Sequence, residues 1–289
     1  MPIKESELII NPDGSIYHLN LLPTDIAPTI ITVGDPDRVA AVSKHFDCIA
    51  IKKQKREFNT HTGTYKGKRI TVISTGIGTD NIDIVLNELD ALVNIDFKTR
   101  EIKKKLTSLH IIRIGTSGAI QSNVPINSFL ISELAVGFDS LLHFYESQHI
   151  QDKAMSQAIM KQTNWLSQKS EPYVVAAHPE LLNRFKSSET VLGFTATNVG
   201  FYGPQGRVLR LATQDNFLMN ALTDFESHGR KITNLEMETA GIYGLASLLG
   251  HKALSLNAIL ANRATGAFSE TPTETVDRLI TYTLNRLIP

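Results

Sequence analysis

Residues 109–121, LHIIRIGTSGAIQ, carry the strongest structural signal in the chain. An apolar run that ends in glycines is typical of a strand buried in a parallel sheet. Arg113 interrupts this run, and a buried arginine requires an anionic partner. The small residues at 115–118 let backbone and hydroxyl donors approach the same anion. This stretch alone leaves two alternatives open: a bound anion such as phosphate, or a structural carboxylate.

Other apolar runs along the chain end in small residues and lead into helical patterns. Residues 29–33 precede Gly34, and Asp35 and Pro36 suit the first turn of a helix. Residues 69–75 precede a glycine turn and an amphipathic helix. Further strands are expected at 129–136, 173–177, 190–200, 232–235 and 253–260, and further helices at 215–228 and near the C-terminus. This alternation predicts an α/β fold that binds its ligand at the carboxyl ends of the strands.

The composition excludes several classes of protein. The 289 residues suit one domain, with a lead-in arm at 1–28 and an exposed, basic, helical insertion at 97–108. Lysine plus arginine equals aspartate plus glutamate, at 29 each, which disfavours nucleic acid and anionic membranes as partners. The single cysteine, Cys48, allows no internal disulfide. We therefore expect a soluble, cytoplasmic protein without a membrane-spanning segment.

Two clusters of polar residues follow the expected strands. Arg38, Arg113 and Arg263 each accompany a turn of small residues. Guanidinium groups match phosphate oxygens in pairs, so these arginines predict a site for a free dianion. Glu236 and Glu238 flank Met237 where a strand enters a helix, and they are either ribose ligands or acids that favour the helix dipole. The turn at 76–78 lacks the third glycine of a dinucleotide fingerprint, which disfavours a Rossmann cofactor.

The chain resembles the nucleoside phosphorylase superfamily, and within it the uridine phosphorylases, from about Tyr17 to the C-terminal helix. The matching motifs are HLNL, GDPDRV, KREF, STGIG, IIRIGTSGAIQ, FYGPQGR, LEMET and LANR, in that order. The resemblance implies a single α/β domain with a central, mixed, partly barrel-like β-sheet flanked by α-helices. It also implies a homo-oligomer whose sites are shared between subunits.

The resemblance assigns a role to each matching residue. It implies that the phosphate binders are Gly34, Arg38, Arg113 and Thr116, joined by Arg56 of a neighbouring subunit. The implied ribose binders are Met237, Glu238 and a neighbour's His18, which contacts the 5'-hydroxyl. The implied base binders are Phe201, Gln205, Arg207 and Arg263. Arg113, Glu238 and Arg207 would carry catalysis. Pattern alone favours a surface role for both His18 and Arg56, and the resemblance reverses this interpretation.

The base-binding residues indicate a pyrimidine. The purine branch of the family places an aspartate near position 263, whereas this chain has Asn262 and Arg263. A uracil leaving group departs with negative charge on its oxygens and is stabilised by cationic donors. Gln205 and Arg207 therefore favour uracil, and they disfavour cytosine because its amino group would face a donor.

The resemblance implies reversible phosphorolysis of uridine, with inorganic phosphate as co-substrate and no catalytic metal or cofactor. A monovalent cation near Glu57 and Ser74 is a further expectation. Three alternatives are a nucleoside phosphorylase of broader base range, a nucleosidase that uses water, and a non-catalytic nucleoside-binding protein. The sequence leaves open the role of Asp80, the choice between dimer and hexamer, tolerance of deoxyuridine or thymidine, and whether the loop at 266–272 closes as a lid.

Overall fold

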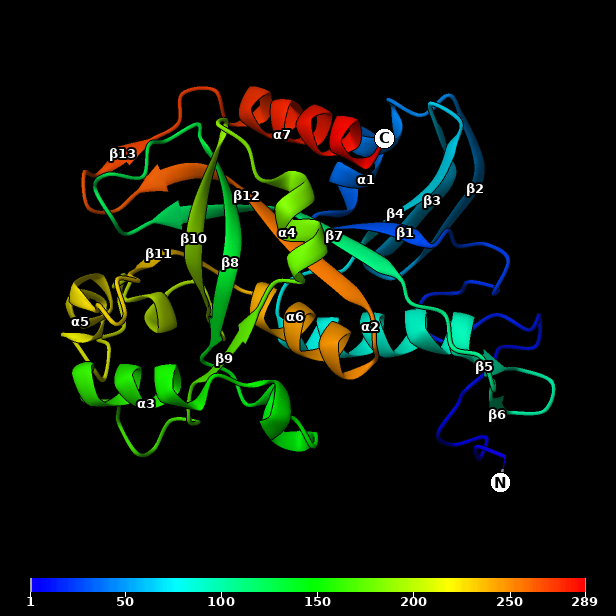
Figure 1. Cartoon of the computed structure of the whole chain (residues 1–289), viewed down its shortest axis with the longest axis horizontal. Helices are drawn as coiled ribbons and strands as arrows, with labels where there is room; N and C mark the ends of the chain where they lie inside the picture. The colour runs from blue at the N-terminus through cyan, green and yellow to red at the C-terminus, as the bar shows by residue number, and fades with distance from the viewer. Residues whose placement is uncertain (1, 289) are drawn as a thin grey trace.

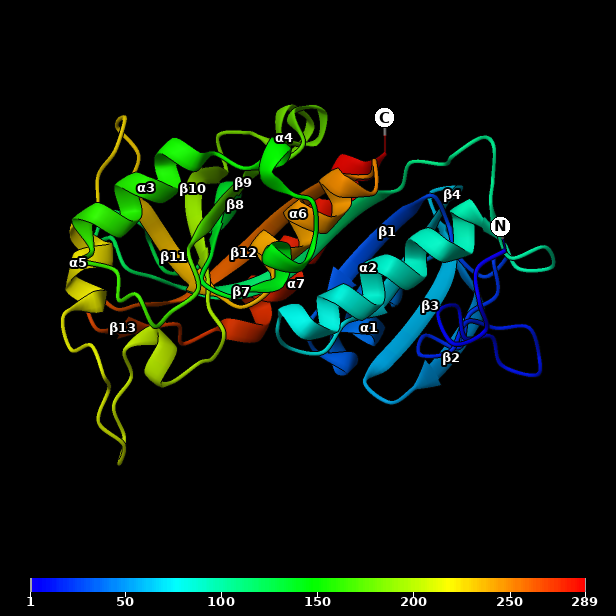
Figure 2. The ribbon, with the colours of Figure 1, turned by 90° about the horizontal axis from the view of Figure 1, so that it is seen from below.

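The computed structural model describes residues 2–288 (Figures 1 and 2). Met1 and Pro289, the two ends of the expected single domain, lie outside the described residues. Helices cover both faces of one large mixed sheet, as the alternating sequence pattern predicts. None of the helices within residues 2–288 is long and apolar enough to cross a membrane.

Five strands of the sheet close on themselves, and this confirms the expected barrel-like character. They are β7 (His110–Ala119), β8 (Phe129–Gly137), β10 (Thr190–Thr197), β11 (Ile232–Glu236) and β12 (Lys252–Asn262). β12 pairs with β7 and β8, β10 pairs with β8 and β11, and β11 returns to β7. The ring contains three parallel pairs and two antiparallel pairs, so the sheet is mixed.

The remaining strands extend the ring. β1 (Thr29–Val33), β4 (Lys68–Ser74), β3 (Phe58–Tyr65) and β2 (Cys48–Lys55) follow β7 in that order, while β9 (Tyr173–Ala176) pairs with β8 and β13 (Ala267–Phe268) pairs with β12. β1 is parallel to both β4 and β7, and β7 is parallel to β12. The carboxyl ends of β1, β4, β7 and β12 therefore meet at one edge.

Seven α-helices within the described residues cover the sheet. They are α1 (Pro36–Ser43), α2 (Thr79–Asn94), α3 (Lys153–Gln162), α4 (Pro179–Phe185), α5 (Leu218–Asp224), α6 (Thr239–Leu248) and α7 (Pro272–Leu287). In Figure 1, α2 and α6 lie together below the sheet, and α7 lies above it with α1. The Asp35 side chain accepts the Asp37 N–H at 2.9 Å, so the expected cap of α1 is confirmed.

One helical prediction was wrong, and another was too long. Residues 97–108 contain no helix, because the chain forms a hairpin between β5 (Ile95–Asp96) and β6 (Glu101–Ile102). The Asp96 carboxylate accepts the N–H groups of Lys98 and Thr99 and thereby stabilises the turn, and the rest of the segment is exposed as expected. The helix expected at 215–228 is confined to α5, since Asp215 forms a local turn before it.

The arm at residues 2–28 lies against β2 and α2 (Figure 2). Leu19 and Leu21 are fully buried and belong to the main core. Lys55 donates to the Tyr17 carbonyl, and its ammonium lies 4.5 Å from the centre of the Tyr17 ring. The arm is therefore packed as part of the domain rather than as a separate unit.

Candidate active site

The strand ends surround a pocket of about 1040 Å³. The expected site residues that line it are Gly34, Arg38, Arg113, Thr116, Phe201, Gln205, Arg207, Met237, Glu238 and Arg263. These residues come from widely separated parts of the sequence, and the parallel ends of β1, β7 and β12 bring many of them together. The structure thus brings this set of residues to one pocket, while the role of each residue stays a prediction.

Arg113 is the most buried cation of the pocket, at 5 % exposure. Its Nη2 lies 2.5 Å from a Glu238 carboxylate oxygen and 3.2 Å from a Glu236 carboxylate oxygen. Its Nη1 donates to the side-chain oxygen of Asn257 at 2.9 Å. The anionic partner of Arg113 in this structure is therefore a pair of carboxylates, which is the second of the two alternatives that the sequence left open.

Glu238 is held from two sides. One carboxylate oxygen pairs with Arg113, and the other accepts the backbone N–H of Gly78 at 2.9 Å. Gly78 stands just before α2, in a conformation with φ of 99° that favours glycine. The turn after β4 thus fixes the direction of a carboxylate that lies after β11.

Glu236 acts as an acceptor for the first turn of α6. Its carboxylate accepts the backbone N–H groups of Glu238 and Thr239 at about 3 Å, and the Thr197 hydroxyl at 2.6 Å. The alternative that these acids stabilise a helix start therefore holds for Glu236. Its second function, holding Arg113, was missed by the sequence reasoning, although the LEMET motif drew attention to the residue.

Burial and the close charges shift the pKa values of this cluster. Burial raises the pKa of Glu238, and the neighbouring Glu236 carboxylate raises it further against the opposing effect of Arg113. Burial lowers the pKa of Arg113, but Glu236 and Glu238 outweigh burial, and the net pKa is raised. Arg113 is therefore a permanent cation, whereas Glu238 takes up a proton more readily than an exposed glutamate.

A second arginine lies beside this cluster. Arg38 Nη1 donates to the Ile114 carbonyl at 3.4 Å, which directs the guanidinium toward β7. Burial and the charge of Arg113 lower the pKa of Arg38, so the two guanidinium groups are close enough to repel each other. Gly34 and Thr116 line the same end of the pocket. Two close cations that face a cavity favour the binding of an anion between them.

The pocket also contains a preformed amide and guanidinium pair. Gln205 is 2 % exposed, and its side-chain oxygen accepts from Arg207 at 2.6 Å. Arg207 also donates to the Phe201 carbonyl and stacks over the Phe201 ring, at 3.8 Å from its centre. Arg263 donates to the backbone carbonyl of Gln205. The residues that the sequence predicts to bind the base therefore contact one another.

Asn262 has a structural role. Its amide nitrogen donates to the carbonyls of Gln121 and Val124 at 2.9 and 2.8 Å, and its oxygen accepts the N–H of Ala264 at 2.9 Å. These contacts fix the turn that carries Arg263 into the pocket. Asn262 thus positions Arg263, and it supplies no acidic group to the site.

Two expected site residues lie outside the pocket of their own chain. His18 is held against α2 by Glu88, and Arg56 is exposed in the turn between β2 and β3. Arg56 has a φ of 54°, a left-handed conformation that only the tight turn explains. Neither residue is brought to the pocket by the fold of one chain.

Several pocket residues were not expected from the sequence. Ile77, Asn81 and Phe268 line the cavity, and Glu57 joins them at the end that holds Gly76. The Ser74 hydroxyl donates to the Glu57 carbonyl at 2.5 Å, so the two residues named for a cation are adjacent. Asp80 is exposed in the first turn of α2 and does not line the pocket.

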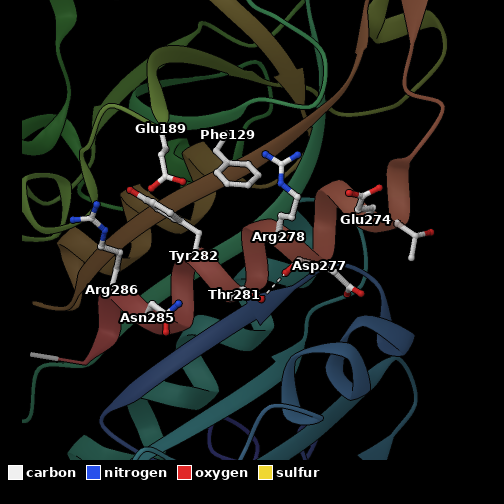
Figure 3. Close-up of a pocket in the computed structure, with 10 residues that line it drawn as sticks. Phe129, Glu189, Glu274, Asp277, Arg278, Thr281, Tyr282, Asn285 and Arg286 are labelled. Carbon is white, nitrogen blue, oxygen red and sulfur yellow. Dashed lines mark hydrogen bonds between the residues drawn. The ribbon is translucent and has the colours of Figure 1, made fainter.

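A second hollow of about 800 Å³ runs along α7 (Figure 3). Arg278 and Arg286 lie on it with the carboxylates of Glu189, Glu274 and Asp277. It contains none of the expected site residues, and its charges are of both signs. The pocket at the strand ends is therefore the candidate active site.

Comparison with known proteins identifies the family. Residues 28–284 match the family described as the Phosphorylase superfamily. The chain belongs to this superfamily. The family assignment made from the sequence motifs is thereby confirmed.

Individual members of the phosphorylase superfamily resemble this chain over most of its length. A uridine phosphorylase from Thermococcus kodakarensis is 31 % identical over 258 residues, covering 89 % of this chain and 81 % of the relative. A DeoD-type purine nucleoside phosphorylase from a Geobacillus strain is 29 % identical, covering 86 % of this chain and 87 % of the relative.

A solved structure also matches. A Trypanosoma brucei nucleoside phosphorylase described as showing uridine phosphorylase activity superposes with a TM-score of 0.86 at 29 % identity, covering 97 % of this chain and 99 % of that chain. Both pyrimidine and purine enzymes are thus similar to this member of the phosphorylase superfamily.

Proposed function

We propose that this chain is a uridine phosphorylase that converts uridine and phosphate to uracil and ribose 1-phosphate, reversibly. The observation that carries the proposal is the set of groups in one pocket: Arg38 and Arg113, the buried carboxylate of Glu238 beside Arg113, and the Gln205 and Arg207 pair. These three groups suit phosphate, ribose and base. The similarity to uridine phosphorylases of two other organisms supports the same assignment.

The phosphate end supports attack on the sugar. Arg38, Arg113, Thr116 and the N–H of Gly34 would hold the dianion beside the anomeric carbon. As the bond to the base breaks, the ribose gains oxocarbenium character, and phosphate on one face stabilises that positive charge. Glu238 would accept hydrogen bonds from the sugar hydroxyls, and Met237 would pack against the ring. No side-chain nucleophile is required.

The base end supports uracil. Gln205 and Arg207 stand side by side with an acceptor next to a cationic donor, 2.6 Å apart. Uracil presents an N–H next to a carbonyl oxygen, so the two edges are complementary. Phe201 would pack against the nucleoside, and Arg207, aided by Arg263, would stabilise the negative charge that the leaving uracil carries.

The proposed site draws on a second subunit. His18 and Arg56 would reach the ribose and the phosphate of a neighbouring molecule, so the functional form would be a homo-oligomer. Phosphate is the co-substrate in this proposal, no catalytic metal takes part, and a monovalent cation beside Glu57 and Ser74 would have a structural role.

A substrate panel tests the proposal. Uridine, thymidine, cytidine and inosine are incubated with the pure protein, each with and without phosphate, and cleavage is followed by absorbance. We expect uridine to be cleaved with phosphate and to stay intact without it. Cleavage of uridine without phosphate would identify a nucleosidase. Cleavage of inosine at a comparable rate would identify an enzyme of broader base range, which the purine relatives make the principal alternative. Binding of uridine without turnover would identify a nucleoside-binding protein.

A further inference from the structure

The half-buried carboxylate of Glu88 holds His18 in one orientation. The His18 Nδ1 lies 2.6 Å from a Glu88 oxygen, and the side chains of His18 and Glu88 are 28 % and 13 % exposed. The same carboxylate accepts the backbone N–H of His18 at 3.1 Å and that of Leu19 at 2.9 Å. One glutamate therefore holds the ring and the backbone of this part of the arm together.

The neighbouring side chain limits the ring further. The Tyr17 ring meets the His18 ring edge to face, with centres 4.7 Å apart, and Lys55 binds both the ring and the carbonyl of Tyr17. His18 thus has little freedom to turn. Its remaining ring nitrogen, Nε2, makes no hydrogen bond within the part of the chain that the structure describes.

The contact with Glu88 determines where the imidazole carries its hydrogen. A carboxylate only accepts, so Nδ1 must donate. In the neutral ring, Nε2 is then an acceptor, because the hydrogen bond at one ring nitrogen sets the state of the other. A free acceptor on a partly exposed, fixed ring is suited to receive a hydrogen bond from a hydroxyl group.

The acceptor cannot serve the pocket of its own chain. Glu88 stands ten residues after Gly78 in the sequence, and Gly78 is the residue that contacts Glu238 in the pocket. Along an α-helix this separation is about 15 Å. His18 does not line the pocket of its own chain, so its Nε2 is available to a ligand held by a neighbouring molecule.

We propose that Glu88 is a positioning residue: it fixes His18 as the Nδ1–H tautomer, so that Nε2 accepts a hydrogen bond from the 5'-hydroxyl of a nucleoside in the neighbouring subunit. This inference rests on the proposed function, and it names a residue that acts on the substrate only through His18.

Kinetics on two substrates test the inference. The value of kcat/KM is measured for uridine and for 5'-deoxyuridine, which lacks the hydroxyl. We expect Glu88→Ala to lower kcat/KM for uridine about 10-fold, the effect of one lost hydrogen bond. The value of kcat/KM for 5'-deoxyuridine should change by less than about twofold. Glu88→Gln, which keeps an acceptor, should restore part of the loss. His18→Ala should cause a smaller loss in the Glu88→Ala background than in the wild type.

A matched control is available on the same helix. Asp90 also faces a histidine, His251, at 3.3 Å, and that histidine is buried away from His18. Asp90→Ala should change both substrates equally. An equal loss on both substrates for Glu88→Ala, or no loss on either, would overturn the inference.

The tautomer is measured separately by 15N NMR of histidine-labelled protein. We expect the His18 hydrogen on Nδ1 in the wild type and a mixture in Glu88→Ala. A hydrogen on Nε2 in the wild type would overturn the inference even if uridine is cleaved. Conversely, a wild type that does not cleave uridine with phosphate would contradict the proposed function, whereas the NMR result would still decide the effect of Glu88 on His18.

Discussion

The carboxylate of Glu238 lies 2.5 Å from the guanidinium of Arg113, although the two residues are expected to bind different parts of the substrates. The ion pair is buried, with about 6 % of each side chain exposed. In the proposed reaction, Glu238 binds the ribose and Arg113 binds phosphate, so this pair fixes the relative position of the two reactants. Proximity of this kind is a major contribution to the catalysis of two-substrate reactions.

The first prediction concerns Arg113. Arg113→Lys keeps the charge but loses the planar fork that contacts Asn257 and the two carboxylates. We expect kcat/KM for uridine to fall about 10²-fold to 10³-fold, with a raised KM for phosphate. Steady-state kinetics at varied phosphate measure both values, and a thermal melt checks that the variant is folded. An unchanged KM for phosphate would show that Arg113 does not bind it.

The second prediction concerns pH. Burial and Glu236 raise the pKa of Glu238. The carboxylate form is needed to accept hydrogen bonds from the ribose, so activity is complete above this pKa and falls as the pH decreases through it. We therefore expect the acid limb of the kcat/KM profile to lie above the ordinary range of a glutamate.

Glu236→Gln tests the cause of this shift. The substitution removes a negative charge next to Glu238, so the pKa of Glu238 should decrease and the acid limb should move to lower pH. Phosphate titrates identically in both proteins, and the difference between the two profiles therefore isolates the enzyme group. A limb that stays in place, or moves to higher pH, would contradict the proposed coupling.

The third prediction concerns a glycine on β7. A Cβ built on Gly115 would lie 1.8 Å from Nη1 of Arg113, so an alanine would displace the guanidinium. We expect Gly115→Ala to reduce kcat/KM for uridine as strongly as the Arg113 substitution. Gly118→Ala is the control for an added methyl on the same strand, since its nearest neighbour is 3.8 Å away, and it should keep its thermal midpoint.

The local patterns predicted most of the fold. The strand at 29–33 and the cap at Asp35 follow from short-range rules on apolar runs and helix starts, and both were confirmed. The segment at 97–108 was wrongly expected to be helical because its lysines suit a helix surface. There the Asp96 side chain accepts hydrogen bonds from the backbone of its own turn. This local interaction competes with helix formation, and helix propensity alone does not include it.

The sequence predicted which residues line the candidate site, but it did not predict how these residues contact one another. The small-residue turns identified Arg38, Arg113 and Arg263, because parallel strand ends converge. The sequence could not show that Glu236 and Glu238 both approach Arg113, since this depends on the antiparallel pairing of β11 with β7. It also could not show that Glu88 holds His18, a contact across 70 residues.

The last prediction concerns the base. Arg207 is the only residue whose side chain hydrogen-bonds to the Gln205 side chain within residues 2–288, and it stacks on Phe201. Arg207→Ala removes the donor for the departing uracil, so we expect kcat/KM for uridine to fall about 10²-fold to 10³-fold. Arg210→Ala, an exposed arginine of the same loop, is the matched control and should keep wild-type activity.

Absorbance assays on uridine and cytidine separate two outcomes of the Arg207→Ala experiment. If Arg207 reads the base, its loss reduces the preference for uridine over cytidine, because cytosine no longer faces a second donor. If Arg207→Ala lowers kcat/KM equally for uridine and cytidine, Arg207 stabilises the loop but does not contact the base. The assignment of uracil as the preferred base would then be wrong.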